Sequence, residues 1–167
     1  MLLLTFQAAG QLYAVDAVRI VEVVPRVNLR PLPHSQAFLA GVFEYRGDVV
    51  VVVDLGVLLG AGPAPDRLST RIILVDRAAP APRRPADDHD ADPSSEPSPS
   101  VPEPSRRSLL GLIAEQVDEL AAVDPEALLP APVRISSAPY LGRLAETPRG
   151  MAQLIAVEKV LEDSIAG

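Results

Sequence analysis

The residues best suited to bind another molecule form the segment Glu44-Tyr45-Arg46-Gly47, which lies between two apolar stretches. A glycine in a short polar segment favours a tight turn, because a positive φ costs little only without a Cβ; we therefore predict that conformation for Gly47. The guanidinium of Arg46 is a planar fork of N–H donors that matches a carboxylate, either on a partner or within the chain. Within the chain, Glu22 is the obvious candidate, since it stands in an otherwise apolar run. The alternative is that Tyr45 and Arg46 are ordinary turn residues and Glu22 is a solvent-facing strand residue.

A catalytic constellation is not apparent, and the chain is predicted not to be an enzyme. Of the two histidines, His34 lies in a Pro-Leu-Pro-His segment without a nucleophile-elbow pattern nearby. A small β-barrel hydrolase that uses His34 is the alternative. His89, among the acidic residues of 87–92, offers ligands for a divalent cation, but a solvated charge run is the favoured interpretation. No glycine-rich loop is followed by Lys-Ser or Lys-Thr, so neither a metal nor a cofactor is predicted.

Composition narrows the class of partner. The 167 residues carry a net charge of −7, and their basic residues are scattered, which argues against nucleic acid. Cysteine is absent, which excludes disulfides and thiolate metal sites. The apolar run at 49–53 is far shorter than the roughly 20 residues that a membrane helix needs. We therefore expect a cytoplasmic protein that does not insert into the membrane.

The elements that must position the turn are mostly strands, because Val and Ile dominate the apolar segments. Short helical turns are predicted at 17–20, capped by Asp16, and at 55–59, and a closing helix at 157–163. The run Val49–Val53 has no polar position, which predicts a strand buried on both faces. Strands are predicted over 2–7, 12–15, 21–24, 37–43, 49–54, 70–76, 109–123, 141–145 and 151–156.

The composition changes abruptly between about 78 and 107, a stretch rich in Pro, Ser, Ala and Asp. Such a segment buries too little apolar area to offset its ordering entropy, so we predict a disordered loop. Because similar strands are predicted on both sides, residues 1–167 are expected to form a single domain interrupted by this loop. The chain begins with Met1 just before the first strand and ends after the last helix, which favours a free-standing protein.

In their order and spacing, these segments resemble the CheW-like domain family. The family's most characteristic stretch combines a Gly-Val pair, a polar-apolar-Arg-Gly turn and a Val-Asp-Leu, and here it reads Gly41-Val42, Glu44-Tyr45-Arg46-Gly47 and Val53-Asp54-Leu55. The resemblance covers nearly the whole chain except 78–107. Its other parts are Leu12-Tyr13-Ala14-Val15-Asp16, Val21-Glu22-Val23-Val24, Leu32-Pro33, the stretch 110–119 in which a glycine opens a strand running into Val-Asp, and the final strand and helix at 153–161.

The resemblance implies two small five-stranded, SH3-like barrels packed on a shared core, with a C-terminal helix. It also implies a non-enzymatic scaffold that couples the cytoplasmic tip of a methyl-accepting chemoreceptor to a CheA-type histidine kinase, in arrays beneath the inner membrane. The alternative within the family is a CheW-like domain that serves another multiprotein signalling assembly.

The same resemblance implies a set of partner-binding residues. Glu22, Gly41 and Arg46 fall where the family's receptor-contacting or receptor-supporting residues lie. The predicted set is completed by the rest of the turn and by two residues expected to border the same groove: Glu44, Tyr45, Gly47, Ile20 and Val21.

Two features depart from the family pattern. The usual Asn-Leu-Arg-Gly is here Glu44-Tyr45-Arg46-Gly47, and the stretch at 78–107 replaces a tight connection. The tyrosine and the Leu-Gly-Leu-Ile-Ala-Glu stretch at 110–115 resemble CheW-like adaptors of Wsp-type surface-sensing systems, which control a diguanylate cyclase rather than flagellar rotation.

Overall fold

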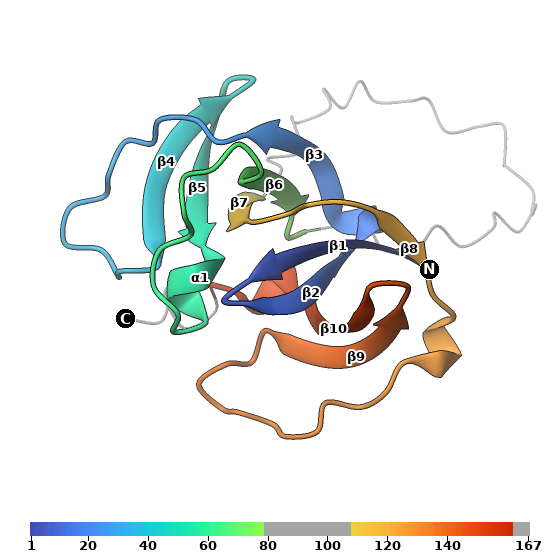
Figure 1. Cartoon of the computed structure of the whole chain (residues 1–167). Coiled ribbons are helices and arrows are strands. Elements are labelled where there is room, and N and C mark those ends of the chain that lie inside the picture. Colours follow the sequence, from blue (N-terminus) through green and yellow to red (C-terminus); the bar gives the residue numbers. More distant parts are fainter. Residues whose placement is uncertain (79–107, 162–167) are drawn as a thin grey trace, which may run out of the picture.

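The computed structural model describes residues 1–78 and 108–161, and it consists of two five-stranded sheets (Figure 1). Strands from both sides of residues 79–107 lie next to each other in each sheet. The prediction of a mostly-β protein built from two five-stranded units is confirmed. No helix in the described part of the chain is long and apolar enough to cross a membrane.

The first sheet has the strand order β8-β1-β2-β10-β9. Neighbouring strands are antiparallel except β2 and β10, which are parallel. The strands are β1 (Leu2–Ala8), β2 (Gln11–Asp16), β8 (Leu120–Ala122), β9 (Leu141–Thr147) and β10 (Gly150–Ile155).

The second sheet has the order β3-β6-β7-β5-β4, with one parallel pair, β5 and β7. Its strands are β3 (Ile20–Pro25), β4 (Leu39–Tyr45), β5 (Asp48–Asp54), β6 (Arg71–Asp76) and β7 (Leu109–Ala114). The short helices are η1 (Ala17–Arg19), α1 (Leu55–Leu58), η2 (Pro125–Ala127) and η3 (Val157–Lys159).

Both sheets are closed in the same way. The chain that leaves edge strand β3 returns to the opposite edge strand β4, where Arg30 and Val42 exchange two backbone hydrogen bonds of 2.9 Å. Likewise, the chain that leaves edge strand β8 reaches the opposite edge strand β9, where Leu129 and Leu144 exchange two bonds of 2.9 Å. Each sheet therefore curls so that its two edges are joined, which leaves fewer unpaired edge groups.

Three apolar clusters fill this architecture. One lies inside the second sheet and includes Val50, Val52 and Ile72, and a smaller one lies inside the first sheet around Leu3 and Ala14. The largest cluster draws on both sheets and forms their shared core. Its buried members are Leu4, Phe6, Ala8, Tyr13, Val15, Val53, Leu55, Ile73, Val75, Leu110, Leu112, Ala114, Tyr140, Ile155, Val157, Val160 and Leu161.

Two tyrosines of the shared core titrate above the ordinary range. Burial raises the pKa of Tyr13, and it also raises the pKa of Tyr140, with a smaller contribution from the charge of the nearby Tyr13. The Tyr140 hydroxyl donates to the backbone oxygen of Leu58 at 3.3 Å, which connects the first sheet's side of the core to α1.

The valine strand is buried differently from the prediction. Val50 and Val52 face the core of the second sheet and Val53 faces the shared core, whereas Val49 is 72% exposed. The reason is that the first sheet covers only one end of β5, so burial on both faces does not extend to the hairpin turn.

Two predicted elements are also shorter than expected. The predicted strand 109–123 is interrupted near Gln116, whose φ of +43° is incompatible with a strand, and it divides into β7 and β8. The closing helix is a single 3-10 turn, η3, within the described residues, and its predicted last residues lie outside them. The loop predicted at 78–107 lies outside the described residues apart from position 78.

Candidate partner-binding site

The β4–β5 hairpin ends in a two-residue turn. Tyr45 and Asp48 form the last strand pair, and Arg46 and Gly47 between them have φ values of +48° and +84°. Two successive positive φ values define the turn type whose twist matches that of antiparallel strands. The positive φ predicted for Gly47 is confirmed. Because the turn is this tight, the side chain of Arg46 projects from the end of the hairpin.

Glu22 reaches this turn from the opposite edge of the sheet. A bulge between Ile20 and Glu22 places Glu22 opposite Leu74, which puts its side chain on the face that lines the second sheet's core. Tyr45, in β4, packs against the same core, and its hydroxyl donates a hydrogen bond to Oε2 of Glu22. Since β3 and β4 are the two ends of the strand order, this side-chain contact joins the edges of the closed sheet.

Arg46 lies over the same two residues, yet it stays at the surface. Its Nη2 is 3.7 Å from Oε2 of Glu22, and its guanidinium carbon is 5.2 Å from the centroid of the Tyr45 ring. The Arg46 side chain is 78% exposed. An ion pair this exposed contributes little to stability, whereas a guanidinium over an aromatic face is held in place while its fork stays in water.

The other predicted site residues divide into supporting and exposed positions. Ile20 and Val21 are half-buried and pack against the shared core and the second sheet's core, respectively. Glu44 is exposed and pairs across the hairpin with Val49, so these two share the outer face.

Gly41 is buried and acts through the backbone. Its φ is +146°, and a Cβ there would lie 2.5 Å from the backbone oxygen of Arg30 and 2.9 Å from Cβ of Leu29. A side chain at this position would therefore disrupt the closure between Arg30 and Val42. Gly41 supports the shape of the site and offers no surface for contact.

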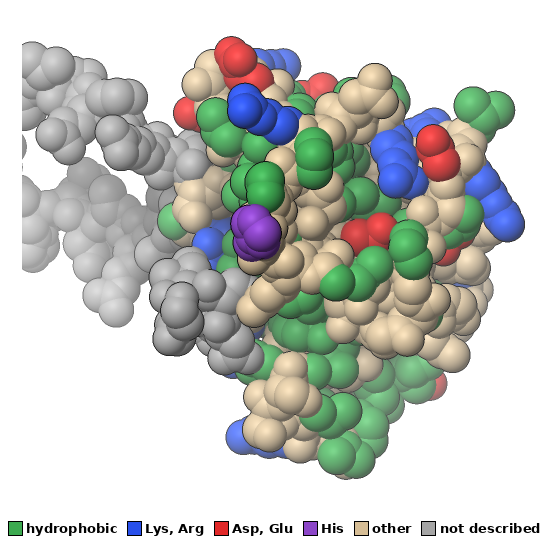
Figure 2. All heavy atoms as spheres, turned by 90° about the vertical axis from the view of Figure 1, so that its left-hand side faces the viewer, with side chains coloured by type: hydrophobic (Ala, Val, Ile, Leu, Met, Phe, Trp, Pro, Cys, Tyr) green, Lys and Arg blue, Asp and Glu red, His purple; other side chains and the backbone are tan. Residues whose placement is uncertain are grey.

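The face that carries the 31–38 loop gives no support to catalysis. His34 is exposed on this loop with a φ of +58°, and the neighbouring Ser35 hydroxyl donates to the backbone oxygen of Leu32 at 2.6 Å. Over residues 1–78 and 108–161, no hydrogen bond or ion pair joins His34 to an acidic side chain. Figure 2 shows basic, acidic and apolar side chains interspersed over this face, without a basic stripe of the kind that nucleic acid requires.

The described residues offer no gathering of three His, Cys, Asp or Glu side chains that would hold a metal ion. The acidic segment 87–92, with His89, lies outside the described residues.

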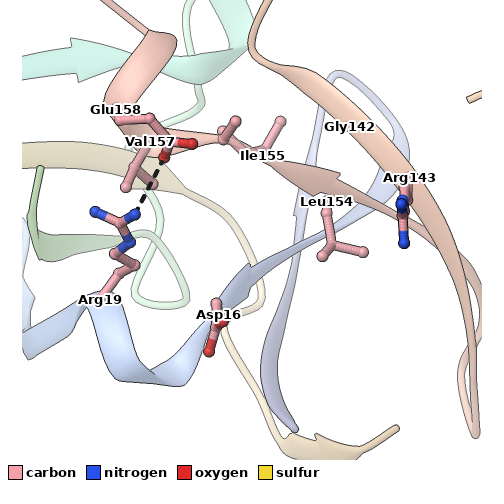
Figure 3. Close-up of a pocket in the computed structure, with 9 residues that line it drawn as sticks. Asp16, Arg19, Gly142, Arg143, Leu154, Ile155, Val157 and Glu158 are labelled. Atoms are coloured by element: carbon pink, nitrogen blue, oxygen red, sulfur yellow. Dashed lines mark ion pairs between the residues drawn. The ribbon is translucent and has the colours of Figure 1, made fainter. Parts of the chain in front are cut away.

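A pocket of about 220 Å³ lies elsewhere, where η1 meets β9, β10 and η3. In Figure 3 Arg19 and Glu158 stand on one side of the pocket, 3.9 Å apart, and Arg143 on the other. Arg19 also donates to the backbone oxygen of Arg77 at 2.9 Å, so it bridges the two sheets. None of the eight predicted site residues lines this pocket, and sequence reasoning gave no signal for it because its walls come from three separated segments of the chain.

Sequence reasoning also missed two structural anchors. Asp54, only 5% exposed, accepts backbone hydrogen bonds from Gly56, Val57 and Ala64, and it therefore fixes both α1 and the loop that follows. Arg149, in the β9–β10 turn, lies 2.8 Å from Asp118. The Val-Asp-Leu pattern marked the first anchor without indicating its role, and no pattern marked the second.

Comparison with known proteins identifies the family of this chain. The family model described as "CheW-like domain" matches residues 2–164. The chain belongs to the CheW-like domain family. The crystal structure of the scaffolding protein TtCheW from Thermoanaerobacter tengcongensis superposes with a TM-score of 0.72 at 24% identity, over 96% of this chain and 87% of that one. At that identity the superposition shows a shared fold.

Curated relatives of this CheW-like domain match over part of their length. A probable chemotaxis protein CheW from Rhizobium etli is 25% identical over 130 residues, which cover 78% of this chain and 66% of the relative. The chemotaxis protein CheW of Treponema pallidum is 32% identical over 53 residues, which cover 32% of this chain and 31% of the relative. The matched regions thus span just under two thirds and about one third of these relatives.

Proposed function

We propose that this CheW-like domain is a non-enzymatic scaffold that couples the cytoplasmic tips of methyl-accepting chemoreceptors to a CheA-type histidine kinase. The observation that carries the proposal is an exposed arginine, Arg46, held over Tyr45 and Glu22 at the closed edge of the second sheet, in a chain of this family. The site provides directional polar contacts beside the apolar core of the second sheet.

The receptor side of the proposal rests on helix recognition. Receptor tips are helical in this scheme, and an amphipathic helix binds through apolar residues on one face with polar residues at its margin. We assign direct contact to Glu44 and Arg46, which are exposed. The remaining members of the set support the site by packing, turn geometry or hydrogen bonding: Ile20, Val21, Glu22, Gly41, Tyr45 and Gly47.

The kinase is proposed to bind a surface separate from the Arg46 turn, so that both partners are held at once. This arrangement implies a cytoplasmic protein at receptor arrays beneath the membrane, acting as one domain over 1–167. A CheW-like domain of another signalling assembly is the second candidate. The Wsp-type assignment rests on Tyr45 and the stretch at 110–115, and it stays a prediction.

Two binding experiments test the proposal. A receptor cytoplasmic fragment and the regulatory domain of a CheA-type kinase are each titrated with the purified chain, and then both are added together. The proposal predicts that the chain binds each protein, and that the receptor fragment and the kinase domain are found in one complex only when the chain is present. Binding to neither protein would refute coupling and favour the second candidate. Hydrolysis of ester, phosphate or glycoside substrates that is lost in His34→Ala would overturn the scaffold assignment.

A further inference from the structure

The two sheets place an arginine at the tip of corresponding hairpins. Hairpin β4–β5 and hairpin β9–β10 occupy the same end of their strand orders, and each is followed by one short helix. Arg46 lies in the first turn and Arg149 in the second. Each arginine has a carboxylate near the opposite edge strand: Glu22 within β3, and Asp118 just before β8. The chain therefore contains its own internal comparison for the Arg46 site.

Arg149 is used inside the molecule. Its Nη1 lies 2.8 Å from Oδ2 of Asp118 and 3.5 Å from the backbone oxygen of Gln116, and its side chain is 26% exposed. These contacts connect the β9–β10 turn to the segment that joins β7 to β8. One guanidinium nitrogen of Arg149 is thus used in contacts within the chain itself.

Arg46 is far more exposed than Arg149, and the residue that precedes the turn also differs between the two hairpins. In the β9–β10 hairpin the last strand residue is Thr147, whose hydroxyl donates to the backbone oxygen of Gly150 at 2.8 Å and so stays within its own turn. In the β4–β5 hairpin the equivalent residue is Tyr45, whose hydroxyl donates to the same oxygen of Glu22 that Arg46 approaches. The tyrosine hydroxyl and Nη2 of Arg46 thus approach the same oxygen, Arg46 at 3.7 Å and with its side chain 78% exposed.

We propose that Tyr45 is a positioning residue: it occupies Glu22 and supports the Arg46 guanidinium on its ring, so that Arg46 binds a carboxylate of the partner protein. This inference rests on the proposed function and deepens it by naming the chemistry that the receptor presents. The partner residue is a Glu or Asp at the margin of an apolar helix face, matched to the planar fork of the arginine.

The first experiment needs no partner. In Tyr45→Phe the ring stays and the hydroxyl is lost, so Glu22 is open to Arg46. Nitrogen-detected NMR of the arginine side chains is expected to show fast rotation of the Arg46 guanidinium in the unmodified chain and slowed rotation in Tyr45→Phe. Arg149 serves as the internal reference and is expected to rotate slowly in both. Equal Arg46 behaviour in both proteins would overturn the role of Tyr45, and hydrogen–deuterium exchange confirms that the variant is folded.

The second experiment measures affinity for a receptor cytoplasmic fragment. Tyr45→Phe is expected to weaken binding about three- to tenfold, the range of one net hydrogen bond. Arg46→Ala is combined in a double-mutant cycle with Glu→Gln and Asp→Asn changes across the receptor tip. The proposal predicts that one acidic position couples to Arg46, while the exposed Arg134, replaced by Ala as a control, couples to none.

The outcomes separate the two claims. If the unmodified chain binds the receptor and Arg46 couples to no acidic residue, the carboxylate inference is wrong and the scaffold function stands. If the unmodified chain binds no receptor, the proposed function fails, and the NMR comparison still decides whether Tyr45 controls Arg46.

Discussion

The hydroxyl of Tyr45 donates a hydrogen bond to Glu22, and this contact joins the two edge strands of the second sheet, β4 and β3. It also leaves Arg46 above both residues, paired loosely with Glu22 and largely in solvent. Three neighbouring side chains thus combine a contact between the two sheet edges with an exposed arginine. Stability and binding are therefore expected to respond differently to substitutions in this site.

Arg46→Ala is expected to weaken receptor binding while leaving the fold intact. The ion pair with Glu22 is long and exposed, so its loss changes the free energy of unfolding by about 0.5 kcal/mol or less. Urea unfolding and receptor pull-down of the same preparation measure both quantities. A large loss of stability would show that Arg46 is structural and would remove it from the binding site.

Arg149→Ala is expected to show the reverse pattern. The Arg149 side chain is 26% exposed and its Nη1 lies 2.8 Å from Oδ2 of Asp118, so its removal is expected to lower the free energy of unfolding by about 1 kcal/mol. Receptor affinity, measured below the unfolding transition, should not change. Equal stability of Arg46→Ala and Arg149→Ala would contradict the distinction between the two hairpin tips.

Asp54→Ala is expected to be strongly destabilising. The carboxylate is buried and accepts from three backbone N–H groups, so its removal leaves these donors without partners at a cost of about 3 kcal/mol. Asp66→Ala is a matched control, because Asp66 is exposed in the same loop region. Thermal and urea unfolding of both variants measure the difference, and similar midpoints would refute the anchoring role.

Gly41→Ala is expected to lower the free energy of unfolding by about 3 kcal/mol. The new Cβ would clash with the backbone oxygen of Arg30, and alanine would also be strained at this positive φ. Gly10→Ala isolates the strain alone, since Gly10 has a φ of +72° and open space around it, and about 1 kcal/mol is expected there. If the two variants unfold at the same urea concentration, the close approach at Gly41 contributes nothing.

Alkaline pH is expected to lower stability through Tyr13 and Tyr140. Burial raises the pKa of both hydroxyls in the folded state, so the folded protein holds these protons at a pH where the unfolded chain releases them. Their contribution is fully present below pH of about 10, the unfolded pKa, and is lost as pH rises through the folded values. Between pH 8 and 11, the free energy of unfolding should decline less steeply for the double variant Tyr13→Phe, Tyr140→Phe than for the unmodified chain.

Much of this organisation is predictable from the sequence because local patterns determine it. The alternating and all-apolar runs marked the strands, Asp16 marked the short helix that it caps, and Gly47 marked the turn. Glu22 was the candidate partner of Arg46 within the chain because it is a carboxylate in an apolar run, and the structure places the two side chains 3.7 Å apart. The exposure of Val49 did not follow, because it depends on how far one sheet covers the other.

The long-range features had no local signal. The Tyr45 hydroxyl reaches Glu22 only because the sheet closes, and Arg149 meets Asp118 across a separation of 31 positions in the chain. The pocket at Arg19 and Arg143 likewise requires η1 to lie beside β9 and η3. Pairings of this kind are set by topology, which residue spacing along one segment does not specify.

The most direct test of the scaffold function is co-sedimentation of a CheA-type kinase with receptor-containing vesicles at increasing concentrations of this chain. The account predicts that sedimented kinase rises with the chain to saturation, and that Arg46→Ala shifts this curve to higher concentration while Arg134→Ala leaves it unchanged. Kinase sedimentation that is independent of the chain, or identical curves for the unmodified chain and Arg46→Ala, would contradict the account.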